Sequence, residues 1–303
     1  MPRSESPPPQ KRRRQSDHEN GTALPPLSLS ILGVEPMDEF IKEIADWTHY
    51  TIMQRPPDLQ GKVEVEAKVG LLRDKQTHER LKFPVLVETI IDPNFDGHRF
   101  ESNMTISQHK HFNTRLNELK MSSTQPDFPS ATPIEYRHLH LVDTFYPSDH
   151  PHDRDKIRVT RDEKTGNVVE CMRKIRLGNL DISSPKRQAD WRVSVNLEIP
   201  VAHPVGSPTH TRKKDRLSYI HEEFSIDLTQ VHSTSSTAAP ELTHELEIEI
   251  TRPQLLLATA AKRNDPNASE VERFAFDELI RAFVNNARIL VRNAAPDGWV
   301  GGV

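Results

Sequence analysis

The chain has 303 residues, a formal net charge of −4, 35% hydrophobic residues and one cysteine, Cys171. This length allows one large domain with a sizeable core. A single cysteine excludes a disulfide framework and a cysteine-rich zinc site, and it is typical of a reducing intracellular compartment. The near-neutral charge does not indicate a nucleic-acid binder, so an electrostatic function has to come from local placement of charge. No apolar run approaches about 18 residues and no secretory leader is present, so we expect neither a membrane span nor export.

Residues 1–28 are predicted to form a disordered tail, because they are rich in proline, serine and charge and lack apolar periodicity. The tail contains a basic run, Lys11–Arg14, beside prolines. Two interpretations of this run stay open: a nuclear import signal, or a solvated tail without a specific partner.

Residues 29–303 are predicted to form one domain that begins and ends with helices. An amphipathic helix is expected at about 36–49, where apolar residues recur at helical spacing and Pro36 suits the first turn. A second helix is expected at about 269–292, where Ser269 and Glu272 have the spacing of a capping box.

Between these helices, about residues 62–252, short alternating segments are separated by turn-forming residues. The pattern predicts a mostly β structure, a sheet or barrel built from hairpins with helices on its flanks. The segment before the last strand, 231–241, is predicted to be a short flexible linker. We find no internal repeat.

The polar faces of the predicted strands carry charges that are sorted by sign. In GKVEVEAKVG, Gly61–Gly70, Glu64 and Glu66 share a face opposite the valines, because side chains at i and i+2 point to the same side of a strand. A second acidic face, in HELEIEI, carries Glu245, Glu247 and Glu249. The strands between them carry bases, namely Arg158, Lys174, Arg176, Arg212, Lys214 and Arg216. A solvated sheet also alternates, but solubility requires no sorting by sign, so we favour a functional interior.

Carboxylates without cysteine favour a hard cation, Mg²⁺ or Mn²⁺, and Arg and Lys suit phosphate. A metal ion beside basic side chains is typical of phosphoryl-transfer sites, where both neutralise charge on the transferring phosphoryl group. The chain has no phosphate-binding glycine loop, no Gly-x-Ser-x-Gly turn, and Leu177 rather than arginine six positions after Cys171. His138 and His140 have the spacing of metal ligands on a strand, but no carboxylate pair lies near them in the sequence, so we do not expect a metal there.

The two acidic strands and the basic strands between them resemble the fungal RNA 5′-triphosphatases of mRNA capping, which are triphosphate tunnel metalloenzymes. The similarity runs from about Ser28, through ILGVEPMDEFIKEIADW, to the final helix. It implies an eight-stranded antiparallel β-barrel, a hydrophilic tunnel inside it, and helices packed outside. The implied activity is that of a polynucleotide 5′-phosphatase, which releases the γ-phosphate of triphosphate-ended RNA in the first step of cap formation.

By resemblance, each charged face receives a role. Glu64, Glu66 and Glu249 would bind the metal, with Glu245 and Glu247 supporting the acidic wall. The residues that would contact the triphosphate are Arg158, Lys174, Arg212, Lys214 and Arg216, with Arg176 as a weaker candidate. Glu198 would orient or activate water. The supporting tunnel positions would be Asp143, Asp190, Asp227 and Thr229.

The resemblance also implies partners. We expect a nuclear protein that forms homodimers and is recruited by mRNA guanylyltransferase or by the RNA polymerase II C-terminal domain. Some family members carry a tryptophan-containing segment that docks the guanylyltransferase, whereas residues 1–28 here contain no tryptophan, so recruitment through the polymerase is kept as an alternative. Two alternatives remain: a tunnel enzyme acting on inorganic triphosphate or free nucleotides, and a noncatalytic binder of RNA or other polyanions.

Overall fold

The structure of the protein is a computed structural model, and it describes residues 26–33, 35, 38–130, 132–148, 156–235 and 238–295. The chain divides into two units, Met1–Met37 and Asp38–Val303, and every element below belongs to the second. The basic run Lys11–Arg14 and the residues Pro36 and Met37 of the first predicted helix lie outside the described residues.

Ten β-strands are present in the described part of the chain. They are β1 (Lys62–Asp74), β2 (Thr89–Ile90), β3 (His98–Glu101), β4 (Glu135–Tyr146), β5 (Ile157–Asp162), β6 (Val168–Ser183), β7 (Asp190–Pro200), β8 (His210–His221), β9 (Phe224–Ser235) and β10 (Glu241–Ile250). The strands pair in the order β10-β9-β8-β4-β5-β6-β7-β1, and β10 also pairs with β1.

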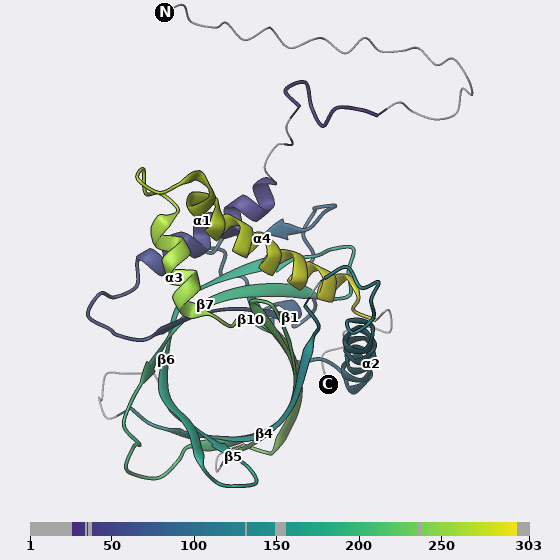
Figure 1. Ribbon diagram of the computed structural model, residues 1–303. Helices are drawn as coiled ribbons and strands as arrows, with labels where there is room; N and C mark the ends of the chain where they lie inside the picture. Colours follow the sequence, from purple (N-terminus) through teal and green to yellow (C-terminus); the bar gives the residue numbers. More distant parts are fainter. Residues whose placement is uncertain are drawn as a thin grey trace, which may run out of the picture. The chain divides into compact units, whose positions relative to one another are not determined.

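This pairing closes an eight-stranded antiparallel barrel, with β2 added to β6 and β3 added to β1 (Figure 1). The predicted fold class is therefore confirmed. The predicted flexible linker is wrong in its first half, because Val231–Ser235 continue β9 and pair with β8.

A β-bulge interrupts β6 between Arg176 and Gly178, where the register with β7 shifts by one residue. Lys174 lies opposite Glu198 before the bulge, and Asn179 lies opposite Ser194 after it. Inward-facing positions are therefore even-numbered before the bulge and odd-numbered after it.

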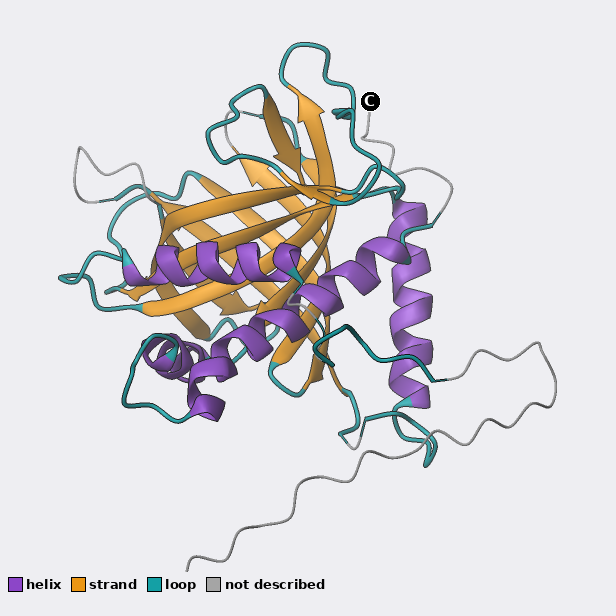
Figure 2. Ribbon diagram, turned by 90° about the horizontal axis from the view of Figure 1, so that it is seen from above, coloured by secondary structure: helices purple, strands orange, loops and turns teal. Residues whose placement is uncertain are grey.

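Three helices cover one side of the barrel, over β7, β1 and β10 (Figures 1 and 2). They are α1 (Glu39–Met53), α3 (Pro253–Lys262) and α4 (Glu270–Arg292). The predicted capping box is confirmed, since Ser269 and Glu272 bond reciprocally at the start of α4. Helix α1 begins at Glu39, where Asp38 caps two backbone N–H groups, and it ends four residues later than predicted.

Two helices were not predicted from the sequence, α3 and α2 (Ile106–Ser122). Helix α2 packs against β9 and β10 and buries only Gln108, Phe112 and Leu116, so its apolar stripe is too narrow to show as periodicity. Among the described residues, no helix has the length and apolar character needed to cross a lipid bilayer.

The hydrophobic core lies outside the barrel, between its wall and these helices. The outward residues of β7 and β1, such as Trp191, Val193 and Val65, are fully buried together with Phe276 and Phe283 of α4. Burial of each large apolar side chain contributes about 1.5–3 kcal/mol to the free energy of folding. Because the hydrophobic core forms outside the barrel, the side chains inside the barrel can be polar and charged.

Two histidines lie between α2 and β10. The ring centroids of His109 and His244 are 4.8 Å apart. Burial lowers the pKa of His109 to about 4, and His244 acts in the same direction while Asp215 opposes it.

We predict that this site makes the protein less stable in mild acid. An unfolded histidine binds a proton below a pKa of about 6.5, whereas folded His109 binds one only near pH 4. Stability should therefore fall as the pH decreases from about 6.5 towards 4. The variant His109→Gln should lose part of this dependence, measured as the thermal unfolding midpoint against pH. His232→Gln, at an exposed position on β9, is the control; an unchanged pH dependence in His109→Gln would contradict the assignment.

Candidate active site

The barrel encloses a polar cavity of about 330 Å³. Its lining includes thirteen of the sixteen site residues that the sequence suggested, namely Glu64, Glu66, Asp143, Arg158, Lys174, Arg176, Glu198, Arg212, Lys214, Arg216, Glu245, Glu247 and Glu249. The alternation of side chains along each strand thus brings the sorted charges into one enclosed space.

Carboxylates form one wall of the cavity on the neighbouring strands β7, β1 and β10. Glu66 lies directly opposite Glu249 in the register of β1 and β10. Asn196 of β7 donates to Glu64 at 2.8 Å and to Glu66 at 3.0 Å, so a single amide holds both carboxylates in place. Like charges directly opposite each other on neighbouring strands are destabilising unless a cation lies between them.

The cost of this crowding appears at Glu249. Burial, together with the nearby Glu64 carboxylate, raises the pKa of Glu249 to about 7. A cation bound beside Glu249 and Glu64 would offset both the burial of this carboxylate and the repulsion between the two.

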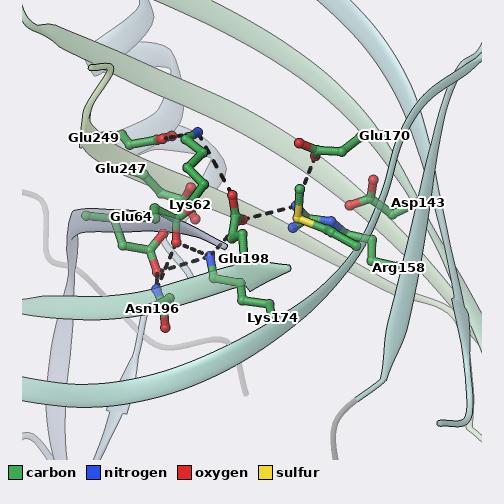
Figure 3. A network of polar contacts seen from close by, with 12 residues as sticks. Lys62, Glu64, Asp143, Arg158, Glu170, Lys174, Asn196, Glu198, Glu247 and Glu249 are labelled. Atoms are coloured by element: carbon green, nitrogen blue, oxygen red, sulfur yellow. Dashed lines mark hydrogen bonds and ion pairs between the residues drawn. The ribbon is translucent and has the colours of Figure 1, made fainter. Parts of the chain in front are cut away.

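Lysine ammonium groups from β1 and β6 partly neutralise the acidic wall, among them Lys62 and Lys174 (Figure 3). Lys174 Nζ lies 2.5 Å from Glu64 Oε2 and 3.5 Å from Glu66 Oε1, and Lys62 Nζ lies 3.4 Å from Glu249 Oε1. The atoms that could bind a metal here are carboxylate oxygens, with an amide beside them. Such oxygen ligands suit a hard divalent cation such as Mg²⁺ or Mn²⁺.

Arg158 reaches the acidic wall (Figure 3) from β5, which lies on another side of the barrel (Figure 1). One of its terminal nitrogens, Nη2, lies 3.3 Å from Glu198 Oε1 and 3.3 Å from Glu170 Oε2. Glu198 also lies 3.9 Å from both Lys62 and Lys174, measured to their Nζ atoms. Glu198 is thus a buried carboxylate at the centre of three cations.

Strand β8 supplies three basic side chains, and each is held by a partner from another strand. Lys214 contacts the carboxylate of Asp143, and Arg212 Nη2 lies 2.7 Å from Glu245 Oε1. Burial lowers the pKa of Lys214, and Asp143 offsets only part of this effect.

Arg216, the third of these side chains, is held by two residues that do not line the cavity. Its Nη1 lies 2.8 Å from Asp227 Oδ2, and its Nε donates to Thr229 Oγ1 at 3.1 Å. Asp227 and Thr229 therefore fix a cavity residue from outside the lining. Among the described residues, Arg176 also lines the cavity and makes no ion pair, so its guanidinium is available to an anion.

The structure corrects the predicted place of Asp190. This buried carboxylate does not line the cavity; it accepts from Arg80 at 2.6 Å and from the backbone N–H groups of Leu72 and Ser184. It lies opposite Gly70, beyond the charged stretch of β1. Parity placed Asp190 on the correct face but could not give its depth along the barrel.

Several cavity residues were missed. Lys62 and Lys68 project inward from β1 beside Glu64 and Glu66, so this strand is not purely acidic as the sorting by sign implied. Lys68 Nζ lies 2.8 Å from Glu247 Oε1. Their even numbers, shared with Glu64 and Glu66, were the signal that could have identified them. Glu170, Thr160, Leu141 and Phe145 also line the cavity.

Comparison with known proteins agrees with this geometry. A family model described as "mRNA capping enzyme, beta chain" matches residues 34–296. The chain belongs to this family. It is 36% identical to the mRNA-capping enzyme subunit beta of Schizosaccharomyces pombe, over 89% of this chain and 86% of the relative. A subunit beta of Cryptococcus neoformans is 32% identical, and this chain spans only 65% of its length.

A solved structure of S. pombe Pct1 RNA triphosphatase in complex with the Spt5 CTD has the same barrel. It superposes with a TM-score of 0.78 at 35% sequence identity, covering 89% of this chain and 100% of that one. A Saccharomyces cerevisiae relative described as polynucleotide 5′-triphosphatase CTL1 is 24% identical over 77% of this chain.

The Asp143–Lys214 pair yields a stability prediction. Both side chains are buried, and removing one member of a buried pair costs about 3–5 kcal/mol because the other charge is left without a partner. Asp143→Asn should therefore lower the free energy of unfolding in urea by an amount of this order. The double variant Asp143→Asn/Lys214→Met should recover most of the loss, and simple additivity of the two single changes would show that the pair is not coupled.

Proposed function

We propose that this protein is a metal-dependent RNA 5′-triphosphatase that removes the γ-phosphate of triphosphate-ended RNA and leaves a diphosphate end for capping. The observation that carries this proposal is one cavity with a carboxylate wall on β7, β1 and β10 and basic side chains from β5, β6 and β8. Family membership supports the choice of RNA over other triphosphates.

Glu64, Glu66 and Glu249 would hold the divalent cation, Mg²⁺ or Mn²⁺. When bound, the cation would withdraw charge from an oxygen of the γ-phosphate. Asn196 keeps Glu64 and Glu66 in place for this role through its two hydrogen bonds.

The ion pairs of the cavity exchange partners when substrate arrives. Lys174 neutralises Glu64 and Arg212 neutralises Glu245 in the free protein. A cation on the acidic wall and a triphosphate on the basic wall would each replace one member of such pairs, so both walls remain neutralised. The protein therefore need not bury a bare charge at either stage.

Glu198 would orient or activate the water that attacks the γ-phosphate. Its carboxylate lies within reach of Arg158 and Lys174, 3.3 Å and 3.9 Å away, so the phosphate that these cations attract would be brought beside it. Arg158, Lys174, Lys214 and Arg216 would stabilise the loosened phosphoryl group. Arg212, Arg176, Glu245 and Glu247 would bind or balance substrate charge, and Asp143, Asp227 and Thr229 would orient the basic side chains that they contact.

The test is release of γ-phosphate from triphosphate-ended RNA with Mg²⁺, with Mn²⁺ and with EDTA. Activity should require the metal, and Glu64→Gln or Glu249→Gln should lower kcat/KM by at least about 10²–10³-fold, the effect of losing one group that stabilises the transition state. Glu118→Gln, on the exposed face of α2, is the matched control and should keep full activity.

The same assay with tripolyphosphate separates the alternatives. Hydrolysis of tripolyphosphate but not of RNA would keep the tunnel chemistry and reassign the substrate to inorganic triphosphate or nucleotides. Binding of RNA without hydrolysis of either compound, and without need of metal, would favour a noncatalytic polyanion binder.

Recruitment is proposed to depend on a CTD of the kind that the Pct1 complex contains. The Pct1 structure was solved with the Spt5 CTD, and its chain is 35% identical to this one. A fluorescent Spt5 CTD peptide should therefore bind this protein, and a scrambled peptide should not. Equal binding of both peptides would contradict recruitment by such a domain, and co-purification with guanylyltransferase would instead support the other expected partner.

The remaining expectations are also proposals. We propose nuclear localisation, a homodimer, and a catalytic domain of residues 29–303 preceded by a tail of residues 1–28. Fluorescence microscopy, light scattering and limited proteolysis test these three statements, respectively.

A further inference from the structure

A cluster of metal-binding side chains lies on the outer face of the barrel, away from the cavity. Asp143 of β4 and Lys214 of β8 point inward, so the alternate residues His138, His140 and Asp215 point outward. His140 and Asp215 are directly opposite each other in the register of the two strands. No carboxylate lies near these histidines in the sequence. In the fold, Asp215 is brought beside them because β4 pairs with β8.

The three side chains converge. His138 Nε2 lies 2.5 Å from Asp215 Oδ1, His140 Nδ1 lies 3.8 Å from the same oxygen, and the two ring centroids are 4.4 Å apart. One ligand atom from each residue lies within 4.8 Å of the other two. Ligands that bind one zinc ion at about 2.0–2.2 Å in a tetrahedral arrangement are about 3.3–3.5 Å apart, so small side-chain rotations suffice.

We propose that His138, His140 and Asp215 bind a divalent transition metal, with zinc as the best fit. Two imidazoles and one carboxylate suit zinc, copper or nickel, whereas Mg²⁺ prefers oxygen ligands alone. All three side chains are partly exposed, between 32% and 52%, so an ion can enter from solvent and water can complete its coordination.

The position of the site gives it a structural consequence. The metal would join β4 to β8, two strands that pair although they are far apart in the sequence. Asp215 lies between Lys214 and Arg216, which point into the cavity. A metal bound outside would therefore fix the backbone of the strand that carries much of the basic wall. This site is independent of the cation proposed for the acidic wall.

The competing interpretation is an ordinary ion pair between His138 and Asp215 that needs no metal. The two interpretations differ in stoichiometry, because only the first predicts an additional zinc ion per chain. They also differ in the role of His140, which an ion pair of His138 with Asp215 does not require.

The experiment measures zinc binding by the full chain without an affinity tag, by competition with a chromophoric chelator in excess Mg²⁺, which saturates the acidic wall. Wild type should bind one more zinc ion than His138→Ala/His140→Ala, and zinc should raise the thermal unfolding midpoint of the wild type only. Loss of a residue that only supports a metal ligand lowers metal affinity about 10–100-fold. Because Asp215 is proposed as a ligand itself, zinc affinity should fall further than this in Asp215→Asn.

The matched control is His232→Ala, which removes an exposed histidine from β9. This variant should bind zinc as the wild type does, and circular dichroism in the absence of zinc should show that every variant is folded. Equal zinc stoichiometry in wild type and the double variant would overturn the proposal. Loss of the site in His232→Ala would overturn the assignment to these three residues.

Discussion

The carboxylates of Glu64, Glu66 and Glu249 lie close together inside a closed barrel, and the rest of the structure depends on neutralising them. Their strands are neighbours, so the backbone forces them together, and the raised pKa of Glu249 reflects that proximity and its burial. Three lysines, Lys62 and Lys68 on β1 and Lys174 on β6, meet this constraint by pairing with these carboxylates. The site is thus an enclosed balance of opposite charges into which a metal and a phosphate can be exchanged.

A polar interior requires the hydrophobic core to lie elsewhere. The outward faces of β7, β1 and β10 supply it, with α1, α3 and α4 packed over them. The acidic wall is therefore backed by the hydrophobic core, because the same three strands carry the carboxylates inside and the core outside. Groups that must hold a cation in fixed geometry benefit from such support.

The sequence predicts this arrangement well wherever strict alternation holds. Parity separates the two faces of β1, β8 and β10, and the sorting of charge by sign, together with the family resemblance, indicates which face lines the interior. Parity does not report depth, so Asp190 was placed in the cavity although it supports the chain beyond it. It also does not report pairing: the carboxylate beside His138 and His140 comes from a strand whose adjacency only the closed topology reveals. Helix α2 was missed because it buries too little apolar surface to leave a periodic signal.

The bulge in β6 changes which residue numbers, even or odd, face the barrel interior. Lys174 and Arg176 face the cavity before it, and Asn179 and Asp181 share a face with Ser194 and Arg192 after it. A regular β6 of the same length without this bulge would keep Lys174 and Arg176 inward but would turn Asn179 and Asp181 towards the apolar layer. Leu180 would at the same time turn towards the polar face. A one-residue irregularity thus allows one long strand to serve two environments whose phases do not match.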